Sequence, residues 1–416
     1  MKIRFFQDKY IMRRISYFII ALSLVSSGCS QKAEEYINSG IVKYNVRDYN
    51  GAIADYNKVI ELEPDNATAY RNRGAAKSNL LDFNGAIADY TKTIELNPDD
   101  ANTYYNRGLV KYSLGDYSGA ITDYSKAIEL DPDHALSYCN RGAAKSNLLN
   151  RAGAILDFSK AVELDPDYAM AYFNRGVVKS ILLDYTGAIT DYDKAIEIDP
   201  EYADAYSNRA LVKATLKDYN GAITDYSKAI EIKPENANAY YQSRAFLNFS
   251  IRDYNGAIAD FTRIIEINPN ANAYNFRGLA KASLKDFNGA IADYTKATEI
   301  NPEYLTAYTN SGTAKDSLRD YIGAVFDYSA VIEIDTNNAA AYYDRGRMKN
   351  KLKQYRGAIA DYTKAIELNP EYAEAYFKRG LAKLNIGEIK SGCVDFNRAG
   401  ELGFSQADKY IRKYCK

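Results

Sequence analysis

The sequence predicts an all-α protein, a solenoid of stacked helix-turn-helix units. A block of 34 residues recurs along the 416-residue chain: "YRNRGAAKSNL" at Tyr70 is followed by "YYNRGLVKYSL" at Tyr104 and "YCNRGAAKSNL" at Tyr138. Each block holds two segments whose apolar residues follow the period of a helix. No segment shows the alternation of a strand. A repeat array also explains the length, because it grows without enlarging a single core.

Eleven such blocks make up a repeat region over 30–406, and we number positions 1 to 34 within each block. In the second block the first helix is predicted over 67–80 and the second over 83–96, capped by Asp82 and stopped by Asn97-Pro98. Block seven is irregular, with one extra residue between Tyr240 and Arg244 and one missing further on. The blocks span 33–66, 67–100, 101–134, 135–168, 169–202, 203–236, 237–270, 271–304, 305–338, 339–372 and 373–406.

Two features of the blocks concern the packing of the helices. Position 7 is Arg in nine blocks, for example Arg73, and position 23 is Asp in all eleven, for example Asp89. Recurring at fixed places on packed helices, these side chains predict a series of partly buried, structural ion pairs. Position 19 is Gly, as in Gly85. A Gly inside a helix costs about 1 kcal/mol relative to Ala, and the sequence offers no physical reason for it.

The block is similar to the tetratricopeptide repeat. That family carries a large aromatic residue at position 4, Gly or Ala at 8, Ala at 20, an aromatic residue at 24 and Pro at 32. Tyr70, Gly74, Ala86, Tyr90 and Pro98 match these positions, and the resemblance covers residues 33–406. It implies a right-handed superhelix that binds proteins or peptides in its concave groove, although a fold does not name a partner.

Residues 1–29 lie outside the period and predict an export signal. Two arginines precede the apolar run 15–25, and the small residues 26–28 then lead to Cys29. This order resembles the lipobox of bacterial lipoproteins, in which the cysteine is lipidated and becomes the new N-terminus. The resemblance implies a lipid-anchored protein of the cell envelope, outside the cytoplasm, and Ser30 favours the outer membrane. An ordinary secretory signal or an uncleaved anchor is the alternative.

Residues 407–416, "ADKYIRKYCK", predict one further helix that caps the open end of the stack. Cys393 and Cys415 fall on elements that should touch, and an exported protein can keep a disulfide. The sequence therefore predicts a disulfide bridge between these two cysteines. Cys139 is left as a packing residue or a free thiol.

The composition argues against catalysis and against nucleic acid as a partner. Lys and Arg number 53 and Asp and Glu 54, a formal net charge of -1, so no basic excess is available for phosphates. The single histidine, His134, lies in a linker, no His and Cys cluster has metal-ligand spacing, and no Gly-rich loop follows a strand. We expect no enzyme activity, no cofactor, no metal and no small-molecule substrate.

The candidate binding residues are asparagines at position 6. By the family resemblance, positions 2, 5, 6, 9, 12 and 13 line the groove. An Asn amide carries a donor and an acceptor, so a row of them can match the backbone of an extended peptide. The arrangement resembles the asparagine ladder on the inner face of the O-linked N-acetylglucosamine transferase superhelix. The row comprises Asn38, Asn72, Asn106, Asn140, Asn174, Asn208 and Asn310. Two alternatives stay open: that these side chains bond locally between neighbouring repeats, or that duplication copied them.

Position 5 adds aromatic residues, among them Tyr105 and Phe173. They suit apolar side chains of a ligand, and packing between repeats is the alternative. Together these features predict a non-enzymatic interaction scaffold or adaptor of the bacterial cell envelope, tethered to a membrane by lipid, that binds an extended peptide or partner protein. The alternative function is a structural envelope component that associates with copies of itself.

Overall fold

The structure is a computed structural model that describes residues 31–415. Every regular element in this range is helical. Residues 31–45 form the first helix, and the chain divides into two compact units after Val212, inside α11 (Ala203–Thr215). The first unit continues with α2 (Tyr49–Leu62), α3 (Ala67–Asn79), α4 (Phe83–Leu96), α5 (Ala101–Ser113), α6 (Tyr117–Leu130), α7 (Ala135–Asn147), α8 (Arg151–Leu164), α9 (Ala169–Ile181) and α10 (Tyr185–Ile198).

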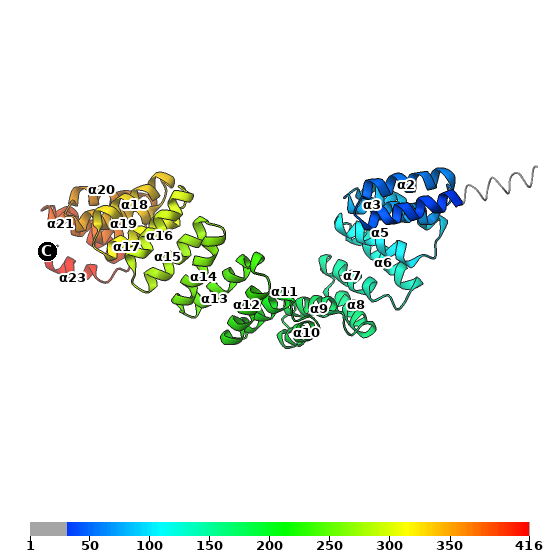
Figure 1. Ribbon diagram of the computed structural model, residues 1–416. Coiled ribbons are helices and arrows are strands. Elements are labelled where there is room, and N and C mark those ends of the chain that lie inside the picture. Colours follow the sequence, from blue (N-terminus) through cyan, green and yellow to red (C-terminus); the bar gives the residue numbers. More distant parts are fainter. Residues whose placement is uncertain (1–30, 416) are drawn as a thin grey trace, which may run out of the picture. The chain divides into compact units, whose positions relative to one another are not determined.

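The second unit is built in the same way, and it ends with a short extra helix. It contains α12 (Tyr219–Ile232), the 3-10 turn η1 (Pro234–Asn236), α13 (Asn238–Ser250), α14 (Tyr254–Ile267), α15 (Ala271–Ser283), α16 (Phe287–Ile300), α17 (Leu305–Ser317), α18 (Tyr321–Ile334), α19 (Ala339–Lys351), α20 (Tyr355–Leu368), α21 (Ala373–Asn385), α22 (Ile389–Glu401) and α23 (Ala407–Tyr414). Within each unit an odd-numbered helix packs against the even-numbered helix that follows it, and each pair stacks on the next (Figure 1). The predicted helix-turn-helix units are confirmed.

Local chemistry sets the helix ends. The Asp82 side chain accepts a hydrogen bond from the Gly85 N–H at 3.0 Å and so begins α4, as predicted. The first helix of the same repeat, α3, ends at Asn79, and Leu81 just beyond its cap has a left-handed φ of 63°. The N–H of Asp82 then reaches back to the Lys77 carbonyl at 2.9 Å, which closes the helix end in a Schellman arrangement.

Small residues let the two helices of a repeat approach closely. A Cβ added to Gly74 on α3 would stand 3.0 Å from the ring of Tyr90 on α4. Tyr90 is therefore held directly against the backbone of α3, and only 3% of its surface is exposed. An aromatic ring packs on a small residue in the same way in repeats of both units, so each repeat contributes a similar part of the core.

The predicted arginine–aspartate ion pairs are confirmed, and they also join neighbouring repeats. Arg141 donates from Nε and Nη2 to the two carboxylate oxygens of Asp157 at 2.9 and 2.7 Å. Its Nη1 donates to Ser125 of the preceding repeat at 3.1 Å, and its guanidinium lies over the Tyr138 ring. Lys145 makes a second ion pair with Asp157 at 2.7 Å. The pairing of arginine with aspartate recurs at Arg73, Arg107, Arg175, Arg244, Arg277, Arg345 and Arg379.

Repeat seven corrects one detail of the sequence analysis. The extra residue is taken up in η1, before α13 begins, and not inside the helix after Tyr240. Tyr241 consequently holds position 4, because Arg244 lies over its ring at 5.6 Å. An insertion within a helix would rotate every later side chain by about 100°, whereas an insertion in the linker leaves the helix register intact.

The C-terminal helix α23 packs on the last repeat, with the Tyr410 ring 5.2 Å from that of Phe377. The structure joins Cys393 on α22 to Cys415 by a disulfide of 2.07 Å. The predicted signal segment 1–29 and its Cys29 lie outside the described residues. In the range 31–415, no helix has the length and apolar character needed to cross a bilayer.

Candidate functional site

A pocket of about 320 Å³ opens between the first helices of repeats one and two. We call it the repeat 1–2 pocket. Its lining residues occupy positions 9 and 12 of repeat one and positions 2, 5, 6 and 9 of repeat two, with the Tyr56 ring at position 24. They are Ile41, Tyr44, Tyr56, Thr68, Arg71, Asn72 and Ala75. The hollow therefore lies on the face that the sequence assigned to ligands, which we call the first-helix face.

Some polar groups around the repeat 1–2 pocket already form ion pairs or hydrogen bonds within the protein. Arg71 pairs with Asp100 at 3.1 Å. Burial acts to raise the pKa of Asp100, but hydrogen bonds from Thr103 and Arg71 outweigh it, and that pKa is lowered overall. The hydroxyl of Tyr44 accepts a hydrogen bond from Asn79 at 2.9 Å. The Arg71 cation is thus neutralised by a carboxylate that stays ionised, so it does not make the pocket a site for anions.

The predicted asparagine row divides into two sets. In one set the amide nitrogen donates to position 5 of the preceding repeat: Asn140 to Tyr105 Oη at 3.0 Å, Asn174 to Cys139 Sγ at 3.8 Å and Asn310 to Asn275 Oδ1 at 3.0 Å. For these three residues, the structure contains the local bonds between neighbouring repeats that the sequence analysis left open as an alternative.

The other asparagines do not bridge repeats. Asn208 donates to the Asp204 carbonyl of its own helix at 2.8 Å. The side chains of Asn38, Asn72 and Asn106 make no hydrogen bond within the part of the chain that the structure describes. Asn38 is exposed, Asn106 is half-buried, and Asn72 lines the repeat 1–2 pocket. Amide donors and acceptors available to a ligand are therefore concentrated in repeats one to three.

The aromatic residues at position 5 mainly pack within the repeats. The ring of Tyr105 lies 5.9 Å from that of Tyr124 and 4.9 Å from that of His134. Phe173 has the same environment, 6.0 Å from Tyr192 and 4.9 Å from Tyr202. Both are half-buried, so packing accounts for most of their surface.

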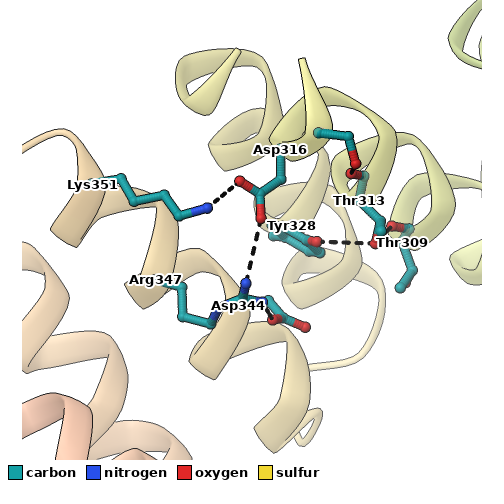
Figure 2. A network of polar contacts seen from close by, with 8 residues as sticks. Thr309, Thr313, Asp316, Tyr328, Asp344, Arg347 and Lys351 are labelled. Carbon is teal, nitrogen blue, oxygen red and sulfur yellow. Dashed lines mark hydrogen bonds and ion pairs between the residues drawn. The ribbon is translucent and has the colours of Figure 1, made fainter. Parts of the chain in front are cut away.

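A charged network on the first-helix face was missed by the sequence analysis (Figure 2). Lys351 and Arg347 of repeat ten both form ion pairs with Asp316 of repeat nine, and Arg347 also binds Asp344 at 2.7 Å. Burial, together with the charges of Asp316 and Glu374, raises the pKa of Asp344 against the opposing effect of Arg347. Asp344 stands at position 6, where most repeats carry Asn. This change from Asn to a charged residue is the feature of the sequence that could have revealed the network.

Two profiles of known protein families match segments of this chain. The profile described as TPR repeat matches residues 48–80, 82–115, 108–148, 184–217 and 346–387, and the tetratricopeptide repeat profile matches 203–236 and 271–304. Together these segments cover more than half of the chain. The chain belongs to the tetratricopeptide-repeat (TPR) family. No curated protein sequence matches it.

Many solved structures are similar to this TPR protein, each over part or most of its length. MamA is 29% identical, covering 39% of this chain and 96% of MamA, with a TM-score of 0.38. YrrB, described as a TPR protein with an unusual peptide-binding site, is 26% identical over 44% of this chain and 93% of YrrB, with a TM-score of 0.38. Yeast Tom70 is 18% identical over 92% and 96% of the two chains, with a TM-score of 0.36.

Proposed function

We propose that this TPR protein is a non-catalytic scaffold that binds a partner polypeptide on the first-helix face of repeats one to three. The observation that carries the proposal is the repeat 1–2 pocket, which exposes the Asn72 amide beside the Ile41 and Tyr44 side chains. Such a hollow offers both an apolar contact and hydrogen bonds, the combination that protein and ligand sites commonly use.

The unbonded amides suit an extended chain. Asn38, Asn72 and Asn106 recur at one helix position with a spacing of 34 residues, and each offers an N–H donor and a C=O acceptor. A peptide backbone presents the same two groups in alternation. The three amides would therefore hold the backbone without reading its side chains, while the repeat 1–2 pocket selects one uncharged side chain.

We further propose that the protein works in the bacterial cell envelope, held there by lipid on Cys29. The basis is the order of basic, apolar and small residues from Met12 to Cys29. Three residues lie between Cys29 and Ala33, and Gln31 and Lys32 already belong to the first helix, so the two steps from Cys29 to Gln31 reach at most roughly 7 Å. The binding face of repeats one to three would then lie near the bilayer, where it would meet partners of the membrane surface.

The binding proposal can be tested with a displayed library of random peptides. Peptides selected on the purified chain should bind it saturably. A photo-crosslinking residue at Thr68, in the repeat 1–2 pocket, should then capture the selected peptide. The same residue at Lys92, on the solvent side of α4, should not capture it and serves as the matched control. Failure to select a saturable binder, or capture only at Lys92, would contradict the proposal.

A further inference from the structure

A second pocket, of about 210 Å³, lies between repeats seven and eight. We call it the repeat 7–8 pocket. One end is aromatic: the Phe246 ring stands edge-on to Phe276 at 4.9 Å and to Phe261 at 5.6 Å. The polar lining residues carry amides and stand on α13 and at the start of α15. The lining residues are Asn238, Gln242, Phe246, Phe261, Ile264, Asn270, Asn272, Ala273 and Phe276.

Repeat seven lacks the aromatic ring that repeats three and five carry at their last position. At the end of repeats three and five, the rings of His134 and Tyr202 cover the position-5 side chains of their repeats. Repeat seven ends in Asn270, whose amide oxygen and nitrogen are both engaged: Oδ1 accepts from the Ala273 N–H at 2.9 Å and Nδ2 donates to the Asn268 carbonyl at 2.9 Å. This short capping side chain cannot fill the volume of an aromatic ring.

One polar atom in the wall lacks a partner. Asn238 Oδ1 is buried and accepts no hydrogen bond from the residues that the structure describes, and Asn238 stands where most other repeats carry Ala at position 1. A buried acceptor that has lost its water without gaining a donor is unfavourable. The oxygen has almost no exposed surface, so a ligand reaches it when the partly exposed Asn238 side chain turns towards the pocket, and an N–H or O–H group that then donates to it removes the penalty.

The lining also limits what can enter. No charged side chain lines the repeat 7–8 pocket, and burying an unpaired charge there would be costly. Its 210 Å³ falls below the roughly 300–1,000 Å³ of sites for drug-sized molecules. Three phenylalanine rings offer the edge and face contacts that favour another ring. One uncharged aromatic group with a donor at its edge meets all of these conditions.

We propose that the repeat 7–8 pocket binds one tyrosine or tryptophan side chain of a partner polypeptide. Its ring packs on Phe246 and Phe276, and its O–H or N–H donates to Asn238 Oδ1. This rests on the proposed function, since it gives the scaffold a second, side-chain-selective contact. The repeat 7–8 pocket lies wholly in the second unit and the repeat 1–2 pocket wholly in the first, so the two contacts can be tested separately.

The test uses acetylated, amidated pentapeptides Gly-Ser-X-Ser-Gly with X as Trp, Tyr or Phe. The protein contains no Trp, so the fluorescence of the Trp peptide reports binding without background. The Tyr and Phe peptides are measured by competition. We expect saturable binding, with the Phe peptide about threefold to tenfold weaker because it lacks one hydrogen bond. Asn238→Ala should abolish that preference and leave the Phe affinity unchanged. Phe246→Ala should weaken all three peptides.

Leu381→Ala, at the position in repeat eleven that Phe246 holds in repeat seven, is the control and should leave the affinity of all three peptides unchanged. Absence of saturable Trp binding, or a Trp preference that survives Asn238→Ala, would overturn the proposal. Circular dichroism confirms that each variant is folded. If library-selected peptides crosslink at Thr68 while the Trp peptide fails to bind, only this inference fails. If the Trp peptide binds but no library peptide is captured at Thr68, the proposed function fails instead.

Discussion

The carboxylate of Asp82 packs directly against Gly85 at the start of α4. One oxygen of the Asp82 carboxylate accepts the Gly85 N–H, and the other occupies the place where a Cβ of residue 85 would stand. The same relationship links Asp116 to Gly119 and Asp184 to Gly187. The glycine at position 19, which the sequence left unexplained, is the residue that allows an aspartate cap to close over the first turn.

This relationship predicts different results for two equivalent substitutions. Gly85→Ala should push the Asp82 carboxylate away and lose a cap of about 1 kcal/mol, which offsets the helix preference of Ala. Gly357 follows Gln354, which makes no cap bond, and its added Cβ would meet only the Lys349 side chain. Gly357→Ala should therefore stabilise the protein by about 0.5–1 kcal/mol. Urea unfolding compares the two, and equal gains would contradict this account.

Much of the fold could be predicted from the sequence, because helix pairs, caps and repeat boundaries are local properties of each block. The division of the asparagine row could not. It depends on the stagger between first helices, which brings Asn140 beside Tyr105, 35 residues earlier. The repeat 7–8 pocket was equally hidden, because it arises where Asn270 replaces a larger ring at a junction. Such features depend on which side chains face each other across repeats, and one sequence does not contain that information.

Arg141→Met should destabilise the protein strongly. It removes two charge-assisted bonds to Asp157 and one to Ser125, and it leaves a carboxylate with 6% exposure paired only with Lys145. Leaving a buried charge unpaired costs about 3–5 kcal/mol. Because Lys145 stays with Asp157, the loss should lie below that range but above about 1.5 kcal/mol, the lower value for one hydrogen bond to a charged group. Arg263→Met, which breaks a surface pair with Glu266, is the control and should cost less than about 1 kcal/mol. Similar losses in urea unfolding for both variants would show that the arginine series does not hold the repeats together.

Alkaline pH should unfold the protein through its buried tyrosines. Burial raises the pKa of Tyr56 and Tyr328 to about 12. Below about pH 10 the tyrosine hydroxyls are neutral in both the folded and the unfolded chain, so these tyrosines do not lower the free energy of unfolding. Between about pH 10 and 12 the unfolded chain loses protons that the folded chain keeps, so stability falls by about 1.4 kcal/mol per unit for each such tyrosine. Urea unfolding followed by circular dichroism should therefore give a midpoint that falls as the pH rises from about 10 to 12, and an unchanged midpoint over this range would contradict the prediction.

Cys29→Ala tests the proposed anchor. If lipid on Cys29 holds the protein in the envelope, the variant should move from the membrane fraction to the soluble fraction of its bacterial host. Ser30→Ala leaves the cysteine in place, and it should remain in the membrane fraction as the control. Fractionation followed by immunoblotting measures both. A Cys29→Ala protein that stays with membranes would contradict lipid anchoring.

The central claim is that the asparagine row contains a ligand-binding set and a structural set, and two triple variants test it most directly. Asn38, Asn72 and Asn106 changed to Ala should weaken capture of a library-selected peptide, by about 0.5–1.5 kcal/mol for each hydrogen bond, and leave the Tm unchanged or slightly higher. Asn140, Asn174 and Asn310 changed to Ala should lower the Tm, because bonds between repeats are lost. Capture by the folded protein should then persist. A fall in Tm for the first variant, or full capture by it, would contradict the account.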